Sequence, residues 1–140
     1  MSISSGTDEI QTVYLSTDNL SNSQDTTSID AQEDREIIGY SLRRDGGNVG
    51  DNYQLSAQAF VGVDPDVGNN HSEDLGGKFF ASMSFVQNGT AGWAHNADDN
   101  IAPGQGSWDW NEDSTLTLAA QESEGGQNIS AAIEVYYRVV

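Results

Sequence analysis

The chain has 140 residues, with 22 acidic residues against five basic ones and a formal net charge of −17, so we expect a single domain with one hydrophobic core. This charge disfavours direct binding to nucleic acid and to anionic membranes, because phosphates and anionic headgroups are negative too. The absence of cysteine excludes a disulfide framework and any zinc site that contains cysteine.

The first 34 residues differ in character from the rest of the chain. Residues 10–15, with Ile10, Val13, Tyr14 and Leu15, predict a short strand. Residues 16–34 are polar and lack a sustained apolar period, which predicts a long loop or arm. Residues 1–8 contain neither a basic segment nor an apolar run, so we expect a protein that is intracellular or released in a particle without a secretion signal.

From residue 35 onward the strand signals become regular. Residues 35–44 are rich in Ile, Tyr and Leu and end at the turn signal Asp45–Gly47. Residues 53–61 alternate apolar and polar side chains until Asp64-Pro65-Asp66 interrupts the run. This period of two is typical of a half-buried strand.

Three further segments repeat the alternation. Residues 79–87 place Phe79, Ala81, Met83 and Phe85 on one predicted face, and residues 115–118 alternate Thr with Leu. The clearest strand is the last, whose predicted inner face consists of Ile129, Ala131, Ile133, Val135, Tyr137 and Val139. A chain that ends inside a strand has its C-terminus tied into a sheet, so we expect truncation there to be damaging.

The pattern as a whole predicts an all-β fold. No amphipathic segment of helical period competes with the six or seven strands, and the turns are rich in Gly, Asn and Asp. Long connections are expected at residues 62–78 and 96–112. We therefore predict a single-domain antiparallel β-sandwich over residues 35–140, with a jelly roll as the favoured form, preceded by a short strand and polar arm over residues 1–34.

Residues 64–70 have oxygen-bearing side chains spaced partly like those of a calcium-binding loop, but the match is poor. Gly68 stands where an oxygen ligand is expected, Asn69 where glycine is needed, and Leu75 where the bidentate Glu should be. A solvated turn is the favoured interpretation.

His71 and His95 are the only histidines, and a metal site would have to bring them together with a carboxylate such as Glu73 or Asp98. The serines stand outside any Gly-x-Ser-x-Gly elbow, and with 22 carboxylates chance pairs are expected. The sequence therefore predicts no catalytic residues, no metal ligands and no cofactor. A cation at an interface is left open.

Trp93, Trp108 and Trp110 are the most suggestive side chains, because they lie in or beside glycine-rich loops. Large aromatic residues dominate interface hot spots and also stack on sugars. The alternative is that these residues cover one end of the sandwich, and the sequence does not decide between the two. We take all three as candidate partner-binding residues.

The charge itself points to concentrated salt. In dilute buffer the repulsion within such a chain opposes compaction, whereas at about 1 M salt the Debye length falls to roughly 3 Å and most of the repulsion is screened. Acidic surfaces favour solubility, and Lys78 is the single lysine. A haloarchaeal origin is expected.

The acidic bias, the single lysine, the polar arm and the terminal strand of residues 129–140 resemble small structural proteins of haloarchaeal virus particles. The resemblance is to the single jelly-roll capsid proteins of icosahedral haloviruses with an internal membrane, or to a capsid-decorating protein of the tailed ones, and it covers residues 35–140 in style. It implies a non-enzymatic virion protein, assembled in the host cytoplasm, whose partners are copies of itself and other capsid proteins. It further implies no direct contact with nucleic acid and no membrane insertion. The chain is shorter than the usual major capsid proteins of that group, which keeps a minor or decorating role open.

Two other functions stay in view. One is a carbohydrate-binding or surface-binding β-sandwich module that uses the tryptophan loops. The other, less favoured, is a metal-dependent enzyme, which requires His71 and His95 to meet in space.

Overall fold

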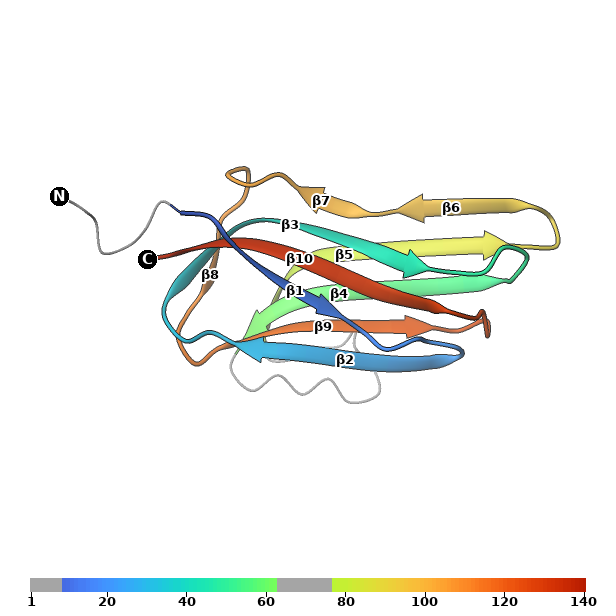
Figure 1. The fold of residues 1–140 in the computed structure, drawn as a ribbon, viewed down its shortest axis with the longest axis horizontal. Helices are drawn as coiled ribbons and strands as arrows, with labels where there is room; N and C mark the ends of the chain where they lie inside the picture. Colours follow the sequence, from blue (N-terminus) through green and yellow to red (C-terminus); the bar gives the residue numbers. More distant parts are fainter. Residues whose placement is uncertain (1–8, 63–76) are drawn as a thin grey trace.

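In the computed structural model, which describes residues 9–62 and 77–140, the chain forms two antiparallel β-sheets packed face to face (Figure 1). Sheet A has the order β1 (Gln11–Ser16), β10 (Ile129–Val139), β3 (Arg35–Gly46) and β7 (Asp99–Ile101), and β8 (Trp108–Trp110) also pairs with β3. Sheet B has the order β2 (Ser23–Asp30), β9 (Thr115–Glu122), β4 (Tyr53–Gly62), β5 (Gly77–Asn88) and β6 (Trp93–Ala97). None of the described segments forms an apolar helix long enough to span a bilayer.

The strand pairing is that of a jelly roll. The first strand pairs with the last (β1 with β10), the second with the second to last (β2 with β9), β3 pairs with β7 and β8, and β4 pairs with β5. The chain is thus rolled up as a folded hairpin whose outer strands alternate between the two sheets. The prediction of an all-β antiparallel sandwich of jelly-roll form is confirmed.

Two connections predicted from the sequence are wrong in part. The polar segment 16–34 contains β2, whose eight residues pair with β9 along their whole length. An edge strand with most of its side chains exposed needs few apolar residues, and polar side chains there discourage aggregation, so the segment lacks the pattern that predicts a strand. Within 96–112 lie β7 and β8, which at three residues each are too short to show a period. The other predicted connection, 62–78, falls largely outside the described residues.

A β-bulge corrects the predicted face of β5. The register of β4 and β5 shifts between Ala59 and Phe60, so that Phe60 pairs with Phe79 and Phe80 is the extra residue. The Phe80 ring then packs towards the core, 5.3 Å from the Tyr40 ring centroid, while Phe79 contacts Phe60 on the outer face of sheet B at 5.6 Å. The alternation holds for Ala81 and the residues after it and fails for Phe79.

The core lies between the sheets and follows the predicted alternation of β4 and β10. Its fully buried side chains include Ile37, Leu42, Leu55, Leu116, Leu118 and Ile133. Strand β10 occupies the middle of sheet A, between β1 and β3, which confirms that the C-terminal strand is tied into the sheet.

Candidate partner-binding surfaces

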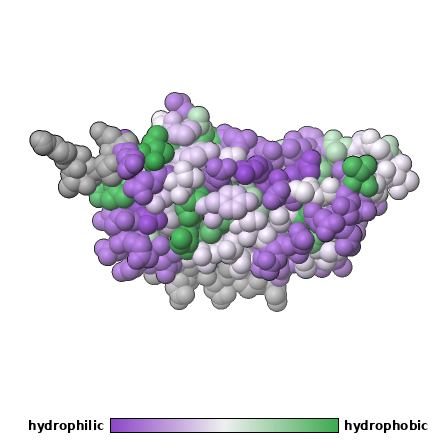
Figure 2. Space-filling view, in the orientation of Figure 1, coloured by the Kyte–Doolittle hydropathy of each residue, from purple (hydrophilic) through white to green (hydrophobic). Residues whose placement is uncertain are grey.

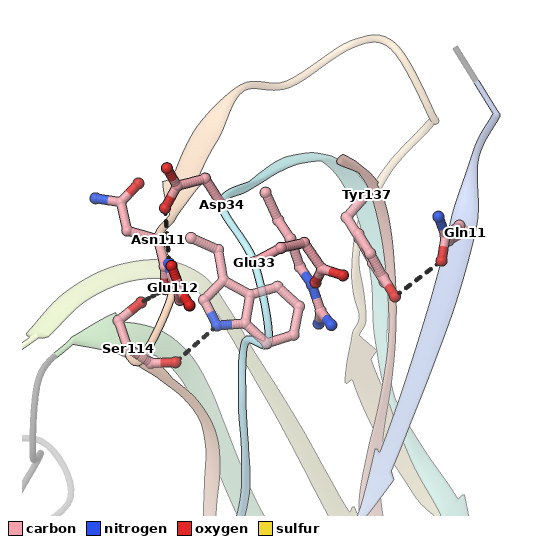
Figure 3. A network of polar contacts seen from close by, with 9 residues as sticks. Gln11, Glu33, Asp34, Asn111, Glu112, Ser114 and Tyr137 are labelled. Carbon is pink, nitrogen blue, oxygen red and sulfur yellow. Dashed lines mark hydrogen bonds and ion pairs between the residues drawn. The ribbon is translucent and has the colours of Figure 1, made fainter. Parts of the chain in front are cut away.

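Trp110 belongs to the core. Its side chain is fully buried at the end of β8, its indole Nε1–H donates a hydrogen bond to the Ser114 carbonyl oxygen at 3.1 Å, and its ring meets Tyr137 edge to face with centroids 5.6 Å apart (Figure 3). Of the two interpretations left open by the sequence, covering one end of the sandwich therefore applies to Trp110.

The same end of the molecule holds a buried cation. The Arg35 guanidinium carbon lies 4.5 Å from the ring centroids of both Trp110 and Tyr137, and Arg35 forms an ion pair with Glu33. The backbone carbonyl oxygen of the adjacent Asp34 accepts a hydrogen bond from the backbone N–H of Val140 at 3.0 Å. These contacts bind the start of β3 to β8 and to the end of β10, which is a structural role.

Trp108 is half-buried and forms an aromatic cluster with Tyr40 and Phe80, with ring centroids 5.6 Å from each. A pocket of about 300 Å³ opens beside it, lined in part by Ser107 and Asp109. Trp108 is therefore partly accessible, and its exposed edge has a carboxylate nearby.

Asp99 ties the two sheets together next to this cluster. Its carboxylate accepts a hydrogen bond from the Tyr40 hydroxyl at 2.8 Å and another from the Ser82 backbone N–H, in sheet B, at 3.0 Å. Burial, and then the contact with Asp99, raises the pKa of Tyr40, which stays a neutral hydrogen-bond donor. The polar atoms here stabilise the edge of the sandwich.

Trp93 lies at the opposite end of the molecule and half of its surface is exposed. It begins β6, next to the β5–β6 turn at the end of the sandwich far from the chain termini (Figure 1). A hollow of about 180 Å³ separates it from Val49, whose side chain is 100% exposed, and the floor contains Gly50 and Gly89. We call Val49, Trp93 and the hollow between them the loop tip.

Hydrogen bonds of two side chains, Gln87 and Tyr53, hold the loop tip in shape. The Gln87 side-chain amide donates to the carbonyl oxygens of Asn48 at 3.2 Å and Asp51 at 2.8 Å. The Tyr53 hydroxyl accepts from the Asn48 backbone N–H and donates to the Gln127 carbonyl oxygen at 2.5 Å. The loop tip is thus a fixed surface.

Glu122 fixes the neighbouring turns with a buried carboxylate. It accepts hydrogen bonds from the backbone N–H groups of Asn22, Glu124 and Gly125, each at 2.8 Å, and of Gln54 at 3.3 Å. Burial raises the pKa of the Glu122 carboxyl, but the four N–H groups together lower it by more, so the pKa lies below its usual value. The carboxylate stabilises the ends of β2, β4 and β9.

Strand β1 presents a free edge, because sheet A ends at β1 in the part of the chain that the structure describes. Its six residues, Gln11–Ser16, carry no charged side chain. Tyr14 on this strand and Ile10 before it are each 50% exposed. The β1 edge therefore lacks the charged side chains that commonly protect an exposed edge strand from pairing.

The three tryptophans do not form one site. Trp110 is at the Arg35 end, Trp93 is at the loop tip, and Trp108 lies within the aromatic cluster beside Tyr40. Sequence reasoning missed Val49, although an apolar residue between Asn48 and Gly50 in a turn is a signal that could have been read. The free edge of β1 had no such signal, since it depends on which strands pair.

The metal candidates are only partly visible. His95 lies in β6 opposite Val86, while His71 and the loop at residues 64–70 lie outside the described residues. Within residues 9–62 and 77–140, no group of three or more His, Asp or Glu side chains is placed to hold a metal ion.

No protein-family model matches the chain, and no curated protein is similar to it in sequence. Among solved structures, a CocE/NonD family hydrolase from Staphylococcus aureus superimposes with a TM-score of 0.47 and 9% identity, over 93% of this chain and 33% of the hydrolase.

Two other matches are structures of viruses or virus particles. A chain of infectious bursal disease virus, Gx strain, has a TM-score of 0.39 and 14% identity over 94% of this chain and 33% of its own. The extra small virus particle of the prawn Macrobrachium rosenbergii has a TM-score of 0.43 and 10% identity over 100% of this chain and 83% of its own. This chain thus spans about one third of the hydrolase and of the bursal disease virus chain. Every TM-score quoted is below 0.5, so the fold assignment rests on the strand pairing.

Proposed function

We propose that this chain is a non-enzymatic structural protein of a virus particle with a halophilic archaeal host, which builds or decorates the capsid through contacts with copies of itself and with other capsid proteins. Jelly rolls serve as capsid subunits and also as lectins and cupins, so the fold alone does not choose among these functions. The choice comes from the surface, and above all from the uncharged free edge of β1 on a chain of net charge −17.

The exposed apolar side chains support an assembling protein. On the face shown in Figure 2, hydrophilic side chains predominate and hydrophobic ones stand among them singly or in small groups. Seven large hydrophobic residues are exposed within the described part of the chain: Ile10, Tyr14, Ile29, Val49, Phe79, Trp93 and Val140. All but Phe79, which lies on the outer face of sheet B, are in edge strands, in a loop or near the ends of the described chain. Contacts at edge strands and loops are suited to joining neighbouring subunits.

The effect of concentrated salt on so acidic a protein also supports a role in assembly. Strong brine screens repulsion between acidic subunits, so contacts between them rest on apolar packing and backbone hydrogen bonds. The proposed location is the virion, after assembly in the host cytoplasm, and the acidic surface argues against direct contact with nucleic acid or insertion into an anionic membrane.

Light scattering of the purified protein tests this function. We expect discrete oligomers or shells in roughly 2 to 4 M NaCl, where screening is nearly complete, and dissociation after dialysis into low salt. A monomer at every protein concentration in brine, both alone and mixed with purified particles of a halovirus, would contradict both self-assembly and decoration.

A second function, carbohydrate binding, is favoured by the loop tip. An exposed indole beside a hollow of about 180 Å³ provides a flat apolar platform of the kind that stacks on a sugar ring. A glycan array in strong NaCl, with Trp93→Ala as the variant and Trp108→Ala as its comparison, checks this. Saturable glycan binding by a monomer that Trp93→Ala abolishes would favour this function over assembly.

A further inference from the structure

We propose that two copies of this chain join through their β1 edges, antiparallel and around a two-fold axis at Tyr14, so that sheet A continues from one copy into the other. The inference deepens the proposed function by naming the surface through which self-assembly begins, and it rests on that function.

Every second residue of β1 points its backbone N–H and C=O groups away from β10. The Thr17 N–H donates to the Ala131 carbonyl oxygen at 3.0 Å, in the same register that places Leu15 opposite Ile133. Residues that bond to the partner alternate along an antiparallel pair, so the odd-numbered residues of β1 point their amide groups at β10. Thr12, Tyr14 and Ser16 therefore direct their N–H and C=O groups to the free edge.

The sequence of this edge is nearly symmetric about Tyr14. Residues 12–16 read Thr-Val-Tyr-Leu-Ser. When a second copy runs antiparallel with Tyr14 at the centre, Thr12 faces Ser16 of the second copy, Val13 faces Leu15, and Tyr14 faces Tyr14. Hydroxyl, aliphatic and aromatic side chains each meet their own kind, which is the self-complementarity that a two-fold interface requires.

The orientation of the side chains on β1 also favours this pairing. Val13 and Leu15 point inwards and extend the core across the junction, while Tyr14, which is 50% exposed, lies on the outer face. Two tyrosines directly opposite each other on one face of an antiparallel pair form a favourable cross-strand contact. The junction thus covers one of the exposed aromatic side chains of the monomer.

Charge selects this edge over that of β2. The β2 edge of sheet B carries Asp25 and Asp30, so two copies meeting there would bring like charges together. Beside Tyr14, the nearest carboxylate across the β1–β10 pair is that of Glu134, which pairs with Arg43 at 3.2 Å. β1 therefore carries no carboxylate of its own, and two chains of net charge −17 meet fewer acidic side chains along it than along β2.

At the far side of sheet A, β7 and β8 are only three residues long and contain Asp99 and Asp109. The far edge of sheet B, β6, is uncharged like β1 but differs in burial. All five of its side chains are exposed, and Asp98 and Asp99 follow it directly. It offers no buried aliphatic residues to extend a core. Because β6 is the nearest competitor, it supplies the control in the experiment.

The junction is small. Stable protein interfaces bury about 1,200 to 2,000 Å², more than a single pair of six-residue edges provides. We therefore expect a weak dimer in solution that becomes stable when many copies hold one another in place. A covalent trap is the suitable probe for such a contact.

The chain has no cysteine, so a single introduced cysteine reports only its own copy in a neighbouring molecule. Opposed residues in a hydrogen-bonded antiparallel pair have Cα atoms about 5.5 Å apart, within the range that a disulfide spans. Tyr14→Cys is to be oxidised mildly in strong NaCl beside two controls, Val49→Cys on the fully exposed loop and His95→Cys at the centre of β6.

We expect Tyr14→Cys to form a disulfide dimer at least about tenfold faster than either control, because pairing raises the local concentration of the second thiol. Hydrogen exchange on the unmodified protein gives a second reading, in which the amide N–H of Tyr14 becomes protected as protein concentration rises. Equal rates for Tyr14→Cys and Val49→Cys without that protection would overturn the inference, and fastest linkage at His95→Cys would move the junction to β6.

The outcomes separate this inference from the proposed function. If the protein forms large assemblies in brine but Tyr14→Cys forms no disulfide dimer, the proposed function is kept and the β1 junction is rejected. Rapid Tyr14 linkage in a protein that never exceeds a dimer, alone or with halovirus particles, would leave the junction and contradict the capsid role. Tyr14→Pro, which removes the outward N–H without touching a bond to β10, should abolish the pairing while the fold is kept.

Discussion

The guanidinium carbon of Arg35 lies 4.5 Å from the centroid of the Trp110 ring, at the point where β3 begins and β8 ends. Arg35 is only 8% exposed, so its charge depends on these rings and on Glu33 in place of water. Arg35 begins β3, Trp110 ends β8 and Tyr137 lies near the end of β10, so the contacts of Arg35 join three strands.

Arg35→Ala should lower the free energy of unfolding by about 3 kcal/mol, because it removes a buried side chain that packs on two aromatic rings and leaves a cavity between them. Urea unfolding at fixed NaCl, followed by tryptophan fluorescence, measures the change. Arg138→Ala is the matched control, since its ion pair with Glu36 is 40% exposed on the arginine side and should contribute under about 1 kcal/mol. Equal losses for the two variants would contradict a special role for Arg35.

Glu122→Gln should cost about 2 kcal/mol near neutral pH, because the amide replaces a carboxylate that accepts four backbone N–H groups. The folded pKa of Glu122 lies below the unfolded value of about 4.3. Its contribution is therefore complete above that unfolded value and is lost as pH falls through the lower folded pKa.

Urea unfolding of both proteins between about pH 3 and 7 checks this, with the difference between them expected to shrink below about pH 4.3. Glu124→Gln serves as the control, because the Glu124 side chain is exposed and contributes only its backbone N–H to the turn. A difference that stays constant across the whole range would show that Glu122 is not the titrating group.

The sequence alone was sufficient to predict a strand where that strand is long and buried on one face. Strand β10 was predicted because every second residue from Ile129 to Val139 is apolar, and these side chains fill or pack against the core. Strand β2 was missed because an exposed edge strand buries little and so needs no apolar pattern. The face of Phe79 was missed because a bulge in the register with β4 is decided by packing at Phe80, which no period in the chain encodes.

The candidate surfaces were harder to predict. The sequence named Trp93, Trp108 and Trp110 together, but neighbours in sequence such as Trp108 and Trp110 differ in exposure because of what packs on them. The free edge of β1 follows from strand order alone, and strand order is a property of the whole fold. The role of these residues in binding a partner stays a prediction.

Trp110→Ala should lower the free energy of unfolding by about 4 kcal/mol, because it leaves a large cavity and removes the ring beneath Arg35. Trp93→Ala, at a half-exposed site, should cost under about 1 kcal/mol. Urea unfolding followed by far-ultraviolet circular dichroism compares them without relying on tryptophan emission. A larger loss for Trp93 would mean that the loop tip is part of the folding core.

Gly126→Ala should destabilise the protein more than an ordinary glycine replacement in a turn. A Cβ atom at Gly126 would lie 2.0 Å from the Tyr53 ring, whose hydroxyl holds two loops in place. Gly104 is the control, because its φ of 91° strains any other residue while nothing lies within 4 Å of an added Cβ. Thermal unfolding should show the larger drop in Tm for Gly126→Ala, and the reverse order would show that the Tyr53 ring moves aside freely.

Thermal stability should rise steeply with salt over the range in which the Debye length shortens, from about 10 Å at 0.1 M to about 3 Å at 1 M. The net charge of −17 opposes compaction until it is screened, so most of the gain in Tm is expected by about 1 M NaCl. Asp25→Asn combined with Asp30→Asn removes two charges from the β2 edge and should reduce the gain. The plateau should fall somewhat, because these carboxylates accept hydrogen bonds from the Asp18 backbone N–H and the Thr115 hydroxyl. A Tm that is the same at 0.1 and 1 M NaCl would show that repulsion among the acidic side chains does not limit stability, and it would remove the physical reason for placing this chain in brine.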